Sequence, residues 1–424
     1  MRDITLRTCL QFVCLAGALP LLSGCAASGG SLVAEFDLDP CSDAIYVPVT
    51  CRGVEHLFLL DTGASLCVFD RSMREQLGEP IGRHYAGTMS GVEAIELYPA
   101  PPLVIGSALL DPDEQVICED LLTAQVSLDR RISGILGMSF LEDYALELDV
   151  DGGKARILES PVPNRVGKGQ KLRLDVAPHD GPELAVDIGD TSQWVPTLDT
   201  GCSFFGGMDH VRCERALGEG LMREGGRIGT ATPHRVVTAE VVVLDSLVVG
   251  PFSHAGVGLS RGESSVLGLP FLYGYNTVMD FPERTICLER RFDGASSGYD
   301  NALDLAVYGS GSGLVVSAVA PGGASETSGL VPGDVILEME GEFVGGMRLA
   351  CAQERLRCAQ TDSVELLIDR DGDRLPVEVR LDGVTREPLA DGPGPSEESG
   401  ESRSGIQAPE RGAETGSGEE GGLR

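Results

Sequence analysis

Short apolar runs rich in Val and Leu recur along most of the chain, and Gly, Pro and Asp residues separate them. Runs of this kind between turn-forming residues are typical of β-strands. Aromatic residues make up 5% of the sequence and Gly contributes 56 residues, which agrees with short strands and many tight turns. The pattern therefore predicts a mainly β fold.

Part of this pattern occurs twice. Segment 132–160 aligns with segment 264–290 at a constant offset of 131 residues. Upstream of each copy lies a second repeated stretch, "LLDTGAS" at 59–65 and "TLDTGCS" at 197–203. We therefore predict two tandem β units, 33–160 and 161–296, related by an approximate two-fold axis. The aligned positions of the longer segments are Gly137, Phe140, Leu141, Tyr144 and Asp149 in the first unit and Gly268, Phe271, Leu272, Tyr275 and Asp280 in the second.

Each short repeat places a carboxylate, Asp61 or Asp199, directly after an apolar strand. One Asp in such a turn commonly caps its own backbone, but two copies at equivalent places favour a shared role. A two-fold relation would bring the turns face to face, and two carboxylates in contact cannot both ionise. They would share one proton, so that one acts as general base toward a water molecule and the other as general acid. Amide hydrolysis needs this pair of roles.

The two units resemble the aspartic proteases, with the two Asp-Thr-Gly stretches as active-site motifs and "ILG" (135–137) and "VLG" (266–268) as the later elements. Their length is closer to the single-lobe retroviral type than to pepsin. The resemblance implies that Asp61 and Asp199 are catalytic, and that segments 84–98 and 228–242 form flaps over the substrate. A glycine beside each aspartate leaves room for the opposite carboxylate. The residues expected to support the active-site loops are Thr62, Gly63, Gly137, Thr200, Gly201 and Gly268.

The motifs depart from the family at two positions. Ala64 and Cys202 stand where pepsin-type enzymes usually carry a hydroxyl group, and Ser65 and Ser203 replace the acid of the retroviral motif. Fewer hydrogen bonds to the ionised carboxylates would leave the pair less acidic. The sequence therefore predicts activity at mildly acidic to neutral pH, and an optimum below about pH 3 would contradict it.

The character of the sequence changes near residue 297, where "GLVVSAVAPGGASETSGLVPGDVILEMEG" (313–341) is followed by a helical-looking stretch. Residues 297–385 resemble a PDZ domain, a small α+β module that binds an extended peptide by strand addition beside a helix. The resemblance places the peptide along Leu314, Val315 and Val316, opposite a helix near 347–357. A purely structural or autoregulatory role is the alternative, because the usual carboxylate-binding loop is only a Gly-rich stretch here, "VYGSGSG" (307–313).

Both ends of the chain differ from the rest. Residues 1–24 carry two Arg residues and an apolar run too short to span a bilayer comfortably, which is typical of an export signal. Its end, "LLSGC", resembles a bacterial lipobox, which implies lipidation of Cys25, a linker over 25–32 and a membrane anchor. The small residue Ala26 after Cys25 resembles the class directed to the outer membrane. The alternative is an ordinary signal peptide cut after Ala26 or Ala27. Residues 386–424 are rich in Gly, Ser, Pro and Glu, so we predict a disordered acidic tail.

Charge and cysteine content restrict the partners. A formal net charge of −32 argues against binding to nucleic acid. Neither the histidines nor the cysteines have metal-ligand spacing, so no metal and no other cofactor is expected. Nine cysteines follow Cys25, and an oxidising compartment would pair some of them, but the sequence leaves their connectivity open.

Together these features predict a lipid-anchored, exported aspartic endopeptidase whose partners are peptide or protein substrates. Two alternatives remain open at this stage. A non-catalytic peptide-binding scaffold would have the same domains, and two chains could each supply one lobe to an active dimer, since the sequence leaves the oligomeric state unknown.

Overall fold

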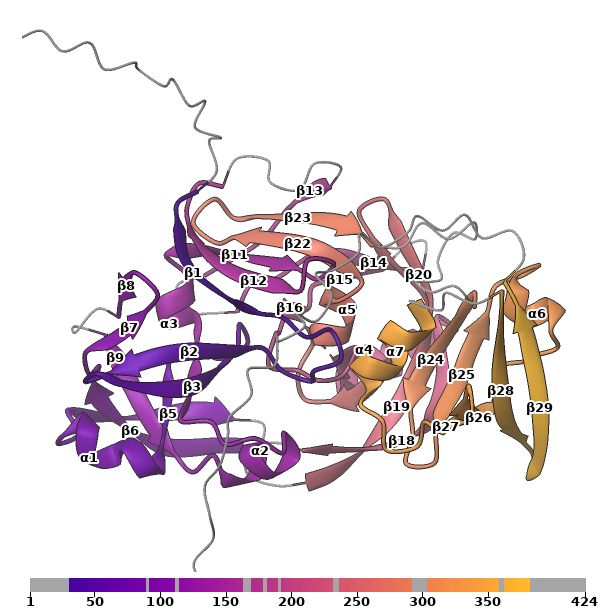
Figure 1. Cartoon of the computed structure of the whole chain (residues 1–424), viewed down its shortest axis with the longest axis horizontal. Helices are drawn as coiled ribbons and strands as arrows, with labels where there is room; N and C mark the ends of the chain where they lie inside the picture. Colours follow the sequence, from indigo (N-terminus) through magenta and orange to yellow (C-terminus); the bar gives the residue numbers. More distant parts are fainter. Residues whose placement is uncertain are drawn as a thin grey trace, which may run out of the picture. The chain divides into compact units, whose positions relative to one another are not determined.

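The computed structural model describes residues 30–88, 91–110, 114–162, 169–177, 181–189, 192–231, 236–291, 303–357 and 362–381 (Figure 1). The fold is mainly β, as the sequence predicts, with several sheets and short helices. The predicted export signal, Cys25 and the acidic tail lie outside these residues. No helix within the described ranges is long and apolar enough to cross a membrane.

The first lobe is built around one large sheet in the order β5-β6-β9-β4-β10-β3-β2-β7-β8. Burial in β2 alternates along the strand, with Val47, Val49 and Cys51 facing the core, as period-two patterning requires. The elements of this lobe are β1 (Leu32–Asp37), β2 (Tyr46–Cys51), β3 (Val54–Leu60), β4 (Val68–Asp70), the 3₁₀ helix η1 (Arg71–Met73), α1 (Arg74–Leu77), β5 (Gly82–Thr88), β6 (Gly91–Pro99), β7 (Leu103–Ile105), β8 (Ala108–Leu109), β9 (Gln115–Glu119), α2 (Leu122–Ser127), β10 (Gly134–Leu136), α3 (Met138–Leu141), β11 (Tyr144–Asp149) and β12 (Lys154–Glu159).

The second lobe repeats this plan with a sheet in the order β15-β14-β19-β20-β17-β21-β16, and β18 pairs with β19. The only tryptophan of the chain, Trp194, is fully buried in this lobe. Its elements are β13 (Gln170–Arg173), β14 (Val186–Ile188), β15 (Ser192–Trp194), β16 (Thr197–Leu198), β17 (Gly206–Asp209), α4 (His210–Gly218), β18 (Met222–Ala231), β19 (Val236–Val249), β20 (Phe252–Gly262), β21 (Val266–Leu267), α5 (Leu269–Leu272), β22 (Tyr275–Asp280) and β23 (Thr285–Arg290).

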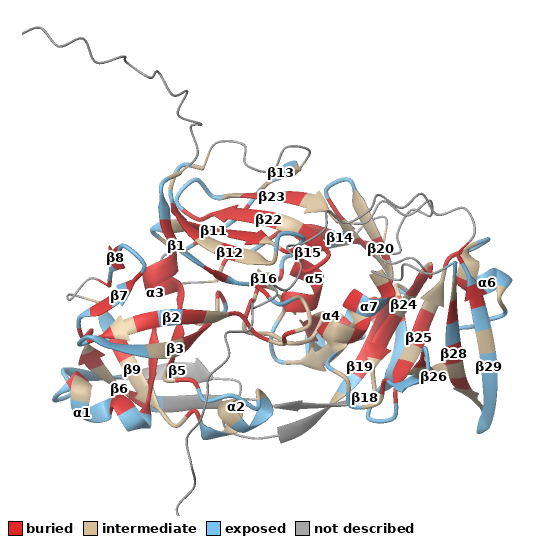
Figure 2. Ribbon diagram, viewed as in Figure 1, coloured by how far each residue is buried: buried red, intermediate tan, exposed pale blue. Residues whose placement is uncertain are grey.

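A sheet shared by both lobes joins them in the order β1-β12-β11-β22-β23-β13. Its two central strands are antiparallel, and Glu147 of β11 lies opposite Val278 of β22. These two residues are related by the same offset of 131 that relates the sequence repeats, so the approximate two-fold axis passes between them. Buried residues are frequent along both central strands (Figure 2), because each has neighbouring strands on both sides and packs on the common core of the lobes.

The repeated aspartates that end β11 and β22 cap turns. Asp149 Oδ1 accepts a hydrogen bond of 2.9 Å from the Gly152 amide, and Asp280 Oδ1 accepts one of 3.3 Å from the Glu283 amide. An Asp side chain that binds backbone amides downstream stabilises a tight turn. The turn explains why this position of the repeat carries an Asp in both lobes.

The third region forms a separate sheet in the order β24-β25-β26-β28-β29, with β27 paired to β26 and a core of its own. Asp334 of the "PGD" stretch is almost fully buried and accepts hydrogen bonds from the Arg370 guanidinium at 2.6 and 2.7 Å. The elements are β24 (Leu305–Gly309), β25 (Leu314–Val319), α6 (Ala324–Thr327), β26 (Val335–Met339), β27 (Glu342–Phe343), α7 (Leu349–Arg357), β28 (Ser363–Arg370) and β29 (Asp373–Arg380).

The third region packs tightly on β20 of the second lobe. A Cβ at Gly256 would lie 2.4 Å from Ala318 Cβ, and a Cβ at Gly258 would lie 2.8 Å from Tyr308 Cβ. The Ser317 hydroxyl donates a hydrogen bond of 2.5 Å to the Gly256 carbonyl. The two glycines of β20 thus allow an approach that larger residues would block.

Candidate active site

Parallel strand pairing places both predicted catalytic aspartates at equivalent positions. Asp61 follows β3, which pairs with β10, and Asp199 follows β16, which pairs with β21. The amide of Asp61 donates to the Leu136 carbonyl at 3.0 Å, and the amide of Asp199 donates to the Leu267 carbonyl at 2.9 Å. The repeated hydrophobic-hydrophobic-Gly element therefore supports the turn that carries each acid.

The two carboxyl groups meet across the lobe boundary, within hydrogen-bond reach of each other. A Cβ at Gly63 would lie 2.6 Å from Asp199 Cγ, and a Cβ at Gly201 would lie 2.5 Å from Asp61 Cγ. Each carboxyl also accepts a hydrogen bond of 2.8 Å from the amide of the glycine in its own loop. The glycines are needed because any larger residue would displace the opposite carboxyl.

Two threonines lock the loops together. The Thr62 hydroxyl donates to the Leu198 carbonyl at 2.6 Å, and the Thr200 hydroxyl donates to the Leu60 carbonyl at 2.9 Å. Each hydroxyl also accepts a hydrogen bond of 3.1 Å from the amide of the other threonine. Both side chains are fully buried. These four hydrogen bonds cross the lobe boundary and hold the aspartates in register; below we call them the threonine grip.

The other two glycines predicted to support the active-site loops, Gly137 and Gly268, pack closely against the backbone of those loops. A Cβ at Gly137 would lie 2.5 Å from the Leu66 carbonyl oxygen, and a Cβ at Gly268 would lie 2.0 Å from that of Phe204. The residue after each glycine donates an amide hydrogen bond to the carbonyl of Ala64 or Cys202, at 2.8 and 2.9 Å. Both lobes therefore use the same contact to hold the active-site loop.

The pair of carboxyl groups is less acidic than two free aspartates. Burial raises the pKa of Asp61, while hydrogen bonds from Asp199 and from the amides of Gly63 and Ala64 partly offset it. Burial and the negative charge of Asp61 raise the pKa of Asp199 well above its usual value. Two carboxyl groups in contact cannot both ionise, so they share one proton, and the pair can supply one base and one acid.

The unusual Cys202 beside this pair does not turn toward the carboxyl groups. Its thiol donates to the carbonyl of Phe204 at 3.7 Å, within its own loop. Burial, followed by the charge of Asp199, raises the pKa of the thiol far above its usual value. A thiol that stays protonated is a poor nucleophile. The position therefore serves packing, and it offers no hydroxyl to the carboxyl group of Asp199.

The segments predicted as flaps are hairpins in both lobes. Strands β5 and β6 pair from Gly82 opposite Leu97 to Thr88 opposite Gly91. Strands β18 and β19 form the equivalent pair, with a register shift between Glu224 and Arg227. Their role over a bound substrate stays a prediction.

The structure corrects the predicted peptide-binding strand of the third region. Strand β25, which carries Leu314, Val315 and Val316, is hydrogen-bonded on both sides, by β24 and β26. Leu314 and Val316 are buried in the core of this region. An inner strand has no edge to which a peptide could add. Among the described strands of this sheet, β24 is the outer strand on that side, and it lies beside α7.

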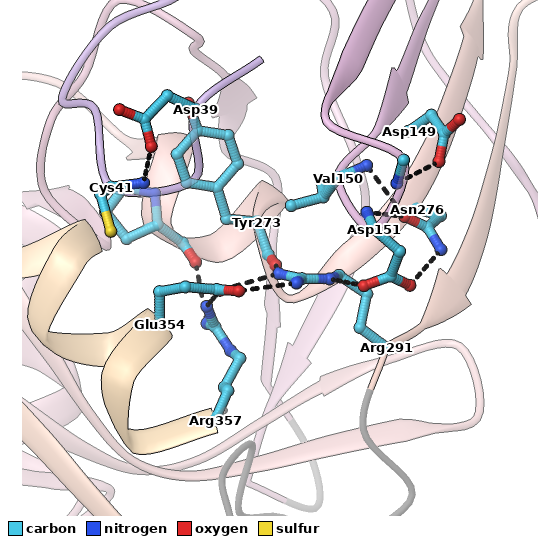
Figure 3. A network of polar contacts seen from close by, with 12 residues as sticks. Asp39, Cys41, Asp149, Val150, Asp151, Tyr273, Asn276, Arg291, Glu354 and Arg357 are labelled. Carbon is cyan, nitrogen blue, oxygen red and sulfur yellow. Dashed lines mark hydrogen bonds and ion pairs between the residues drawn. The ribbon is translucent and has the colours of Figure 1, made fainter. Parts of the chain in front are cut away.

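A polar network that the sequence analysis did not predict joins three parts of the chain (Figure 3). Arg291, which follows the last strand of the second lobe, donates to Asp151 of the first lobe at 2.7 Å and to both oxygens of Glu354 in α7 at 2.8 and 3.0 Å. The Asn276 amide donates to the other Asp151 oxygen at 2.7 Å. The Arg291 side chain is 6% exposed and that of Glu354 11% exposed, so this ion pair is shielded from water.

Comparison with known families agrees with this description. Residues 47–140, within the first lobe, match the family model of aspartyl proteases, and residues 290–369 match that of PDZ domains. The chain therefore carries an aspartyl protease domain and a PDZ domain. A search of curated proteins gives no match.

Proposed function

We propose that this protein is an aspartic endopeptidase whose single active site is formed by both lobes of one chain. The contact between the carboxyl groups of Asp61 and Asp199 supports the proposal most directly, because two carboxyl groups that share one proton can act as base and acid. Since one chain supplies both aspartates, catalysis does not require a second copy.

In the proposed reaction, ionised Asp61 accepts a proton from a water molecule, which attacks the carbonyl carbon of the scissile peptide. Asp199 donates its proton to the carbonyl oxygen as the tetrahedral intermediate forms. Collapse of that intermediate breaks the C–N bond, and the proton that Asp61 received passes to the leaving amine. One hydroxyl of the intermediate returns its proton to Asp199 as the carboxylic acid product forms. The threonine grip keeps the two acids at a fixed separation through these transfers, since misplacement of a catalytic group is costly.

The PDZ domain would bind an extended peptide along the outer strand β24, beside α7. This assignment replaces the strand predicted from sequence, because β25 is enclosed by its neighbours. Substrate or partner recognition at this site, and export with a lipid anchor at Cys25, complete the proposal. The anchor is supported by the lipobox-like "LLSGC" stretch, and two or three acyl chains would hold the protein stably at a membrane.

The decisive experiment measures peptide cleavage by soluble protein that begins after Cys25, over a broad peptide library from acidic to neutral pH. Asp61→Asn and Asp199→Asn should each abolish cleavage, because either change removes the acid–base pair. Asp129→Asn is the matched control, since Asp129 is exposed and its left-handed backbone conformation suits Asn. Circular dichroism should show that all three variants fold.

Two results would oppose the proposal. Cleavage that persists in either active-site variant would exclude the aspartate pair as its source. Absence of cleavage by the wild-type protein at every pH would favour a non-catalytic peptide-binding scaffold. Peptide binding to the PDZ domain would then be the activity to measure.

A further inference from the structure

A loop of the first lobe lies against helix α7 of the PDZ domain. Asp43 of this loop forms an ion pair of 3.6 Å with Arg348, which directly precedes α7. Two residues earlier, the thiol of Cys41 contacts the thiol of Cys351. Arg348 and Cys351 are three residues apart, so they lie on the same face of the helix. Two consecutive contacts thus align residues 41–43 with the first turn of α7.

The surroundings of Cys41 fix its position. Its amide donates a hydrogen bond of 2.9 Å to Asp39 Oδ1, which closes a tight turn at the end of the loop. Figure 3 shows the Cys41 sulfur directed toward α7, the helix that also supplies Glu354 and Arg357. The Arg291–Glu354 ion pair holds the same helix from another side. The two thiols are therefore brought together by contacts that do not depend on a covalent bond between them.

We propose that Cys41 and Cys351 form a disulfide that links the first protease lobe to the PDZ domain. Five other cysteines of the described residues contact groups that are not cysteines: Gln76 for Cys51, Ser139 for Cys67, and backbone carbonyls for Cys118, Cys202 and Cys213. Contact between two cysteines far apart in sequence therefore singles out this pair. The proposal stands apart from the proposed protease chemistry, because it needs neither aspartate.

Thiol–disulfide exchange with an external disulfide, such as oxidised glutathione, balances the reaction. Burial, followed by the neighbouring Cys351, raises the pKa of Cys41 to about 12, so Cys41 stays protonated and the attack begins at Cys351. Cys351 loses its proton, bonds to one glutathione sulfur and releases the other glutathione as a thiol. Cys41 then gives up its proton and attacks Cys351, which forms the protein disulfide and releases the second glutathione. Two protein thiols are oxidised and one glutathione disulfide is reduced.

The disulfide would join residues 41 and 351, and the chain segment between them contains nearly all of both lobes. A disulfide that closes a long loop restricts the unfolded chain strongly. It would also hold the first turn of α7, and with it one wall of the peptide site proposed beside β24. The Asp43–Arg348 ion pair alone is partly exposed and contributes little to this attachment.

The test compares full-length protein equilibrated with oxidised or with reduced glutathione. Oxidation should remove two free thiols from the wild-type protein, and the oxidised form should unfold several degrees higher. Cys41→Ser and Cys351→Ser should each leave the remaining partner thiol unpaired in the protein and abolish the rise in unfolding temperature. Cys287→Ser is the matched control, because Cys287 is a half-buried cysteine of β23 and should leave both effects unchanged.

Peptide mapping identifies the partners directly. Cleavage at Arg355 and Arg357 places Cys351 and Cys358 on different peptides, and cleavage before Asp43 separates Cys41 from Cys51. The expected linked species joins the Cys41 peptide to the Cys351 peptide. Thiol loss that is unchanged in Cys41→Ser, or a linked species containing Cys358 in place of Cys351, would overturn the proposal.

Discussion

The threonine grip allows the strongest quantitative prediction. Thr62→Val and Thr200→Val each replace a hydroxyl with a methyl group at nearly constant shape. Thr62→Val removes the 2.6 Å hydrogen bond to the Leu198 carbonyl and the 3.1 Å hydrogen bond from the Thr200 amide. Thr200→Val removes the two symmetrical bonds, at 2.9 and 3.1 Å.

The expected cost follows from burial. A buried hydrogen bond contributes about 1 kcal/mol net, and a buried group that loses its partner costs about 1–3 kcal/mol. Two bonds are lost in each variant, so the free energy of unfolding should fall by about 2–4 kcal/mol. Because the grip sets the separation of the aspartates, kcat should also fall by about 10-fold to 100-fold.

Urea unfolding measures the first effect, and the fluorescence of buried Trp194, the only tryptophan, reports it from the second lobe. Thr285→Val is the control, because Thr285 lies in β23, away from the grip. If either active-site variant loses less than about 1 kcal/mol and retains full activity, the hydroxyls do not hold the lobes together as argued.

Three further predictions rest on named contacts. The pKa of Asp199 is higher in the folded protein than in the unfolded chain, where it is about 4. This carboxyl group therefore stabilises the fold fully below about pH 4, and the contribution is lost as the pH rises through the pKa of the folded state. Asp199→Asn should therefore raise the unfolding temperature most at neutral pH, in calorimetric scans, and an equal rise at pH 4 would contradict the sign. Gly201→Ala should reduce kcat/KM by about 100-fold, because the added Cβ would displace the carboxyl group of Asp61. Gly218→Ala is the control: its Cβ would meet no atom within 4 Å, so kcat/KM should stay unchanged. Arg291→Met should lower the free energy of unfolding by about 3 kcal/mol in urea, because buried Glu354 loses two short hydrogen bonds and keeps the longer one of 3.5 Å from Arg357. Arg83→Met is the control: it breaks a pair whose Arg is 78% exposed and should cost less than about 1 kcal/mol.

The repeat made most of the active site predictable from sequence. Two copies of one motif at matching places imply a two-fold arrangement, and this arrangement brings Asp61 to Asp199 without knowledge of any loop. The same reasoning explains Gly63 and Gly201, because close approach of the two copies leaves no space for a Cβ. The local sequence pattern was enough to predict these positions, because each lobe builds the same turn from the same kinds of residue.

The PDZ groove and the contacts between domains were harder to predict. The apolar run at 314–319 is suited to a peptide-binding strand and to an inner strand alike, and only the pairing with β24 and β26 distinguishes them. The ion-pair network consists of ordinary charged residues from three distant segments, Asp151, Arg291 and Glu354. Their spacing in the sequence does not predict that they meet. The contact between Cys41 and Cys351 is equally non-local, as connectivity of cysteines generally is.

The central pair β11 and β22 has a consequence for the order in which the protein is made. Until residues 275–280 are available, β11 lacks the strand that occupies one of its edges, and the first lobe presents a row of unsatisfied backbone groups. An emerging first lobe could pair this edge with another copy of itself, since the register of the pair is close to two-fold symmetric. Fusion of the lobes in one chain therefore supplies each new first lobe with its proper partner at high effective concentration, before a neighbouring chain can take its place.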